Sequence, residues 1–183
     1  MDKLKLTIEL VPQTCWFSNL RKVLTTSEWD RVRKYTYSLS EDRSCMICGT
    51  HEGRLSAHEI WEYDMQTHTQ KLIGLIALCD DCHMVKHIGL AQIQGKFILA
   101  QNHFCKVNQC DGVVLDEAMQ EAYEMYHIRS DIDDWKLDIS YLKEIGFDDI
   151  YNKYKNAYEP EHIDFDEFGI PVSSQSLLKK RRF

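Results

Sequence analysis

Two pairs of cysteines with the spacing of a metal-binding knuckle lie near the middle of this chain. Cys45 and Cys48 form the first pair, in CMIC, and Cys79 and Cys82 form the second, in CDDC. A Cys-x-x-Cys pair brings two thiolates to one ion, and two such pairs complete the tetrahedral shell of a structural zinc site. The spacing therefore predicts one structural Zn²⁺ held by all four sulfurs.

Three nearby histidines have no role in such a zinc site. His83 follows Cys82 directly and His87 lies four residues later, so on a helix the two imidazoles share one face. His58 lies between the two cysteine pairs, on a segment that we expect to be a strand. Three nitrogen ligands with open coordination positions suit a catalytic metal better than a structural one. We therefore expect a second divalent ion at these histidines.

Two other interpretations of the same residues remain open. One is a single structural zinc ion with a mixed ligand set, for example Cys45, Cys48, Cys82 and His87. That arrangement leaves His58 and His83 as ordinary core or surface side chains. The other interpretation is a set of reduced cysteines without any metal.

The same stretch resembles the HNH endonuclease family, whose core is the ββα-metal fold, in its zinc-knuckle form. The resemblance rests on LSAHEIW and on LCDDCHMVKH. With PQTCWFSNLR, HEIWEYD and WKLD, the likeness to a bacterial and phage group of predicted HNH proteins extends over roughly residues 9–147. It implies a fold in which a β-hairpin and a helix together hold one metal ion.

The resemblance also implies a role for each matched position. His58 takes the ligand position on the strand, and His83 and His87 take those on the helix. Mg²⁺, Mn²⁺ or another divalent ion would then stabilise the scissile phosphate during hydrolysis of DNA. Glu59 stands at the general-base position, where the family usually has histidine, and Gly74 stands near the position of the family's asparagine. The implied catalytic residues are Glu59, His58 and His83.

These two departures from the family pattern favour a second hypothesis, a catalytically inactive zinc module of the same shape. Residues 111–167 contain five basic residues among many acidic ones. Such a surface suits a protein partner better than nucleic acid. The module would therefore bind a protein through its acidic C-terminal half and touch nucleic acid with its basic residues.

Composition and charge set limits on these hypotheses. The chain has 183 residues, of which 44% are hydrophobic and 28% charged, and its net charge is −7. That charge excludes a generic nucleic-acid coat, since phosphate contacts need Lys and Arg. Residues 1–50 hold eight basic and six acidic residues. We therefore expect DNA contacts in this half, from Arg21, Arg31, Arg33 and Lys34.

The sequence also gives an expectation for the compartment. No apolar run approaches the roughly 20 residues that span a bilayer, and the N-terminus lacks the apolar core of a signal peptide. We therefore expect a cytoplasmic protein without a membrane partner. Its seven cysteines would meet a reducing environment, which favours metal binding or free thiols over disulfides.

The elements that must position these residues predict an α+β fold. The expected strands or extended segments are 4–11, 54–61, 71–78 and 135–139, and the expected helices are 28–39 after Ser27, 80–90 ending near Gly89, 96–108, 114–128 and 148–158. Four parts follow: 1–40 as an N-terminal strand and helix, 41–91 as the HNH-like metal core, 92–147 as a helical extension and 148–183 as a partly ordered tail.

Overall fold

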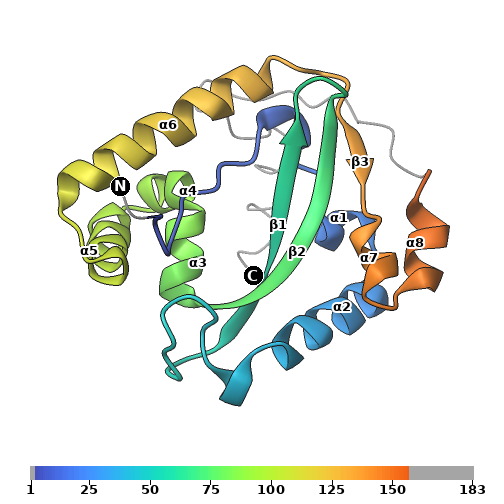
Figure 1. Ribbon diagram of the computed structural model, residues 1–183, viewed down its shortest axis with the longest axis horizontal. Helices are drawn as coiled ribbons and strands as arrows, with labels where there is room; N and C mark the ends of the chain where they lie inside the picture. The colour runs from blue at the N-terminus through green and yellow to red at the C-terminus, as the bar shows by residue number, and fades with distance from the viewer. Residues whose placement is uncertain (1–2, 157–183) are drawn as a thin grey trace, which may run out of the picture.

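A long β-hairpin runs through the centre of the molecule, as the computed structural model shows (Figure 1). The structure describes residues 3–156. Strands β1 (Leu55–Asp64) and β2 (Thr69–Cys79) pair antiparallel, and β3 (Lys136–Asp138) adds to β2 in parallel. The strand order is β1-β2-β3. With the helices on both sides of this small sheet, the expected α+β class is confirmed.

One irregularity in the hairpin decides which side chains share a face. Ile60 is paired with Gly74, but the next residue, Trp61, is paired with Leu72, so Ile73 is an extra residue in β2. A bulge of this kind shifts the alternation of side chains by one residue. As a result Leu72 and Leu75 pack into the same core, although three positions separate them.

Four helices lie on one side of the hairpin, to the left in Figure 1. They are α3 (Asp80–Lys86), α4 (Ile88–Ile93), α5 (Phe97–Asn108) and α6 (Gly112–Ser130). Their apolar side chains form a first core with the cysteine knuckle, and its fully buried members include Leu78, Val85, Ile88, Phe104 and Leu115. The cysteines are thus part of a hydrophobic core and not of an exposed loop.

Four further helices cover the other side of the hairpin, to the right in Figure 1. They are α1 (Leu20–Val23), α2 (Thr26–Ser38), α7 (Tyr141–Glu144) and α8 (Asp148–Tyr154). A second core lies here, with Leu20, Val32, Leu72, Leu142 and Ile150 fully buried. Two short 3₁₀ turns, η1 (Gln13–Cys15) and η2 (Glu41–Arg43), connect these elements to the rest of the chain.

The N-terminal segment is an extended arm and not a strand of the sheet. Leu6 is fully buried, and the side-chain amide of Asn108 satisfies both its backbone N–H and its C=O, each at 2.9 Å. The backbone N–H of Glu9 donates to the carbonyl of Lys86 at 3.0 Å. The arm is therefore held by α3 and α5. Of the two forms expected for residues 4–11, a strand or an extended segment, the structure shows the extended segment.

Several expected helix boundaries are corrected. Helix α2 begins after Thr25 and not after Ser27, because Thr25 and Glu28 form a reciprocal capping box. The expected metal helix over 80–90 is two helices that meet at His87, because the ψ of 45° at His87 ends the first helix. Gly89 lies inside α4 and is not a C-cap.

The C-terminal expectations fall partly outside the structure. Helix α8 lies within the predicted 148–158, while the rest of the predicted tail, from 157, lies outside the described residues. Among residues 3–156, no helix combines the length and the apolar character needed to cross a bilayer.

Candidate metal centre

The four cysteines converge as the spacing predicts. The sulfurs of Cys45, Cys48, Cys79 and Cys82 all lie within 4.8 Å of one another, and Cys48 and Cys79 are separated by 3.7 Å. Backbone hydrogen bonds close the first pair into a tight turn, since Gly49 N–H donates to Cys45 O at 2.8 Å. Such a set of four sulfurs can bind one tetrahedral ion. The mixed alternative with His87 fits less well, because His87 lies with the other histidines.

The electrostatics of this cluster fit a cation at its centre. A hydrogen bond from Cys82 lowers the pKa of Cys45 to about 4, and the same contact raises that of Cys82. Burial and the neighbouring negative charge raise the pKa of Cys79 to about 11. Without a cation, the protein therefore favours a single thiolate in the cluster and disfavours deprotonation of Cys79 and Cys82. A divalent cation is what stabilises several thiolates at such short separations.

His103 supports the cysteine cluster from α5. Its Nε2 lies 3.1 Å from the sulfur of Cys82, and its Nδ1 lies 4.0 Å from a carboxylate oxygen of Asp81. An imidazole N–H directed at a thiolate orients the sulfur and disperses its charge. This contact could not be predicted from local spacing, because 21 residues separate the two partners.

The three histidines form a second cluster on the face of the sheet that α3 covers. The candidate ligand atoms of His58, His83 and His87 lie within 4.8 Å of one another. Their ring centroids are separated by 5.4, 5.1 and 4.7 Å, with large angles between the ring planes. His58 comes from β1, His83 lies in α3 and His87 ends it. Each side chain thus brings one nitrogen close enough to the others to share an ion.

The protonation of two of these imidazoles fits metal binding. Burial, together with the charge of His58, lowers the pKa of His83 to about 4 and, with His83 as well, that of His87 to about 3. Both rings are therefore neutral at pH 7, and each offers a nitrogen lone pair. A neutral imidazole is the form that ligates transition metals. The donor set thus fits one divalent ion.

A carboxylate that sequence reasoning missed lies beside this cluster. Oε2 of Glu9 is 2.7 Å from Nε2 of His58, and its other oxygen accepts a hydrogen bond from Nζ of Lys86. Burial alone would raise the pKa of Glu9, but the hydrogen bond from His58 and the charge of Lys86 outweigh it and hold the pKa at about 2. Glu9 is thus a permanent negative charge at the edge of the histidine cluster.

Glu59, the predicted general base, lies on the opposite face of β1. Its carboxylate accepts hydrogen bonds from the backbone N–H of Leu20 at 3.0 Å and from the indole N–H of Trp61 at 3.2 Å. Burial raises its pKa to about 7, against the lowering effect of these hydrogen bonds. The structure therefore does not bring this carboxylate into the histidine cluster, and its role as a base stays a prediction.

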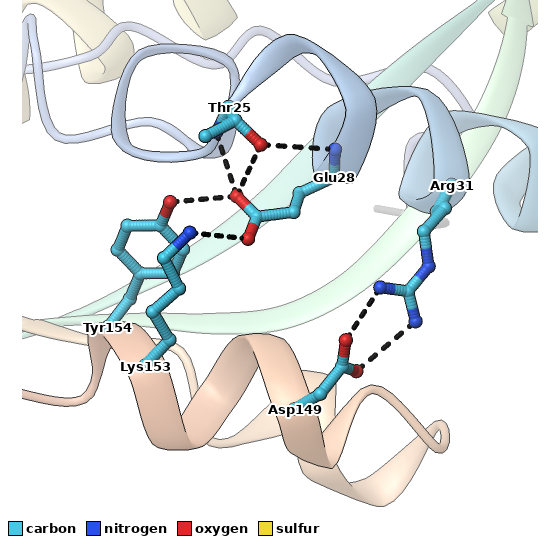
Figure 2. Close-up of polar contacts among 6 residues, drawn as sticks. All are labelled: Thr25, Glu28, Arg31, Asp149, Lys153 and Tyr154. Atoms are coloured by element: carbon cyan, nitrogen blue, oxygen red, sulfur yellow. Dashed lines mark hydrogen bonds and ion pairs between the residues drawn. The ribbon is translucent and has the colours of Figure 1, made fainter.

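The predicted DNA-binding residues separate into two groups. Arg21 and Arg33 line an open groove of about 1470 Å³, which is also lined by His58, His83 and His87. Arg31 instead makes two hydrogen bonds with Asp149 of α8, at 2.6 and 3.2 Å (Figure 2). Lys34 is exposed on α2, outside the lining of this groove. Of the three basic residues of α2 that the sequence singled out, only Arg33 lines the groove with the histidines.

Comparison with known proteins leaves the family open. No family model matches the chain, and neither the curated proteins nor the solved structures contain a significant match. The function therefore has to be argued from the residues of the site itself.

Proposed function

We propose that this protein is a metal-dependent endonuclease that hydrolyses DNA phosphodiester bonds. The observation that supports the proposal most is the cluster of His58, His83 and His87 on a groove that also contains Arg21 and Arg33. Two of these imidazoles are neutral and partly buried, and the candidate ligand atoms of all three lie within 4.8 Å of one another. The four-cysteine knuckle would hold Zn²⁺ and fix the start of α3.

Each part of the site has a separate task in this proposal. The histidines hold the ion, and Arg21 and Arg33 attract the phosphates of the DNA into the groove. When bound, a divalent metal supplies a Lewis acid for the phosphate and lowers the pKa of a bound water. A separate side-chain base is then less necessary.

The contacts of Glu59 favour the alternative, a zinc module without catalytic activity. The carboxylate at the base position is bonded to Leu20 and Trp61 and supports the packing of α1 on the hairpin. In that case the acidic C-terminal half would bind a protein partner. The histidine cluster favours the nuclease, because a module that only binds has no need of three converging imidazoles.

A plasmid-nicking assay separates the two functions. Wild type and His83→Ala, each loaded with one equivalent of Zn²⁺, are compared with Mg²⁺, Mn²⁺, Co²⁺ or Ni²⁺ added. We expect wild type to nick the plasmid. The nicking rate of His83→Ala should be lower by at least about a hundredfold, since one of the three proposed metal ligands is removed. The matched control is His51→Ala, an exposed histidine outside both metal clusters.

Folding and zinc content are measured on the same samples, by circular dichroism and metal analysis. If folded, zinc-loaded wild type cuts neither DNA nor RNA with any of these metals, the nuclease proposal is wrong. The search then turns to a protein partner for the acidic half.

A further inference from the structure

We propose that Glu9 is a fourth protein ligand of the ion held by His58, His83 and His87. The assignment rests on the proposed metal site and deepens it. The observation that carries it is the 2.7 Å separation between Oε2 of Glu9 and Nε2 of His58. The N-terminal arm, and not only the hairpin and α3, would then build the site.

The arm holds this carboxylate in a defined position. The backbone N–H of Glu9 donates to the carbonyl of Lys86, and the ammonium of Lys86 donates to Oε1 of the same Glu9. Lys86 is 4% exposed and also donates to Oγ1 of Thr7 at 2.8 Å. Two contacts with one residue thus fix both the backbone and one oxygen of Glu9. The second oxygen is left facing His58.

The separation between Glu9 and His58 is close to that of two ligands on one metal. Oxygen and nitrogen ligands each lie at about 2.0–2.2 Å from a transition metal, so neighbouring ligand atoms lie roughly 3 Å apart. The observed 2.7 Å needs to open by only a few tenths of an ångström at His58. Glu9 lies outside the group whose ligand atoms are all within 4.8 Å of one another, so its carboxylate also has to shift toward His83 and His87 when the ion binds.

Lys86 explains how a negative charge is tolerated at this partly buried place. It lies on α3 between His83 and His87, so one short helix supplies two imidazole ligands and the cation that holds the carboxylate. A buried ammonium needs such a partner, because burying an unpaired charge is costly. The same pair keeps Glu9 directed at the site in the absence of metal.

The fourth ligand narrows the class of metal. Three imidazoles and one carboxylate suit first-row transition metals better than Mg²⁺, which prefers oxygen ligands and water. A six-coordinate ion would keep two positions for water and a phosphate oxygen, whereas four-coordinate Zn²⁺ would keep none. We therefore infer that Mn²⁺, Co²⁺ or Ni²⁺ supports the activity and that Zn²⁺ at this site supports it poorly.

Cobalt binding tests the assignment without relying on activity. The full chain, preloaded with one equivalent of Zn²⁺ at the cysteines, is titrated with Co²⁺ by calorimetry and by visible absorption. We expect Glu9→Gln to raise the Kd of Co²⁺ at least about tenfold, which is the least that loss of even an indirect partner costs. We also expect its visible bands to change in position and intensity. The control is Glu62→Gln, an exposed position on the same strand as His58.

Two results would overturn the assignment. If the Kd rises but the absorption spectrum is unchanged, Glu9 only orients His58 and does not bind the metal. If neither changes, Glu9 has no part in the site. Should Glu9→Gln lose its zinc or its fold, Glu9→Asp provides the same comparison, because it keeps the charge but withdraws the carboxylate by one methylene.

The same samples keep this assignment distinct from the proposed nuclease. A Glu9-dependent Co²⁺ spectrum in a protein that nicks nothing would support the ligand and reject the nuclease. If nicking requires His83 but Glu9→Gln changes neither the nicking rate nor the Co²⁺ spectrum, the nuclease is supported and the Glu9 ligand is rejected. A wild type that takes up no second ion would reject both.

Discussion

At the scale of single residues, the neighbours His58 and Glu59 show how one strand serves two purposes. Adjacent side chains on a strand point to opposite faces, so His58 faces the metal cluster while Glu59 faces α1. The hydrogen bonds of Glu59 to Leu20 and Trp61 satisfy two donors that would otherwise be buried without partners. Its contacts are those of a residue that supports the fold.

The Glu59→Gln variant tests that role. The amide keeps one acceptor oxygen but directs N–H groups at one of the two donors, so one donor loses its partner. Because burial raises the pKa of Glu59 to about 7, the fold already disfavours its charge, so we expect the free energy of unfolding to fall by no more than about 1 kcal/mol, measured by chemical denaturation. We expect the nicking rate per folded molecule to stay within a few fold of wild type. A loss of a hundredfold or more in folded Glu59→Gln, with Glu62→Gln unaffected, would instead establish Glu59 as the base.

Residue spacing predicted that the four cysteines meet and that His83 and His87 lie together, while the place of His58 depended on the expected hairpin. A Cys-x-x-Cys pair and two histidines four residues apart are local patterns, and local geometry brings such side chains together. Glu9 could not be found in this way, because its contact with His58 spans 49 residues and depends on how the arm packs on α3. The opposite orientation of Glu59, by contrast, was already implied by the alternation of side chains on a strand.

At the scale of elements, α2 is tied to α8 by a cluster of polar contacts (Figure 2). The carboxylate of Glu28 accepts hydrogen bonds from Thr25 in its own capping box, from Tyr154 at 2.7 Å and from Lys153 at 2.8 Å. Burial would raise the pKa of Glu28, but these contacts outweigh it and lower the pKa to about 2. One side chain thus caps one helix and binds another.

This lowered pKa gives a prediction about pH. A carboxyl whose pKa is lower in the folded than in the unfolded chain stabilises the fold above pH 4.5, and this contribution is lost as the pH falls toward 2. We expect Glu28→Gln to lower the free energy of unfolding by about 1–2 kcal/mol at pH 7. The difference from wild type should narrow below about pH 4.5, in denaturant titrations from pH 7 to 3.

The matched control for this prediction is Glu41→Gln, an exposed carboxylate in η2. It should change stability little at any pH. A Glu28→Gln penalty that stays constant down to pH 3 would show that the contacts do not depend on the charge of Glu28.

Helix α2 also predicts which arginine binds DNA. Arg33 lines the groove and pairs with Asp30 at 2.6 Å, whereas Arg31 is held by Asp149 on the side of α8. We expect Arg33→Ala to weaken DNA binding severalfold, since one phosphate contact is removed. The slope of the logarithm of the binding constant against the logarithm of the salt concentration should also become shallower by about one. Fluorescence anisotropy at several salt concentrations measures both quantities. Arg31→Ala should leave them unchanged, and equal effects of the two variants would contradict the assignment.

The pattern of elements was largely predictable, but two of their junctions were not. The hairpin and the long helix α6 have clear alternation and periodicity, so their existence followed from the sequence. The break at His87 has no proline to mark it. The bulge at Ile73 likewise depends on the need to bury Leu72 and Leu75 in one core. Such features are set by tertiary packing and leave no local pattern.

At the scale of the whole molecule, the hairpin separates two hydrophobic cores, of which only one contains the knuckle cysteines. The first core contains three of the four knuckle cysteines, packed with residues of α3, α5 and α6. The second contains residues of α1, α2, α7 and α8 and includes no cysteine. Binding of a structural zinc ion is coupled to folding, because its ligands are assembled only in the folded state. Zinc should therefore stabilise the first core directly and the second only through the shared hairpin.

Removal of zinc should consequently open one side of the molecule before the other. With a chelator present, we expect amide hydrogen exchange to rise in α3 and α5 by orders of magnitude, while α2 and α7 keep most of their protection. Readdition of Zn²⁺ is the control and should restore the original pattern. A uniform rise in all helices would mean that the two cores unfold as one cooperative unit. In that case loss of the metal at the cysteines unfolds both cores through the hairpin that they share. The groove that contains the three histidines would then depend on zinc at the cysteines.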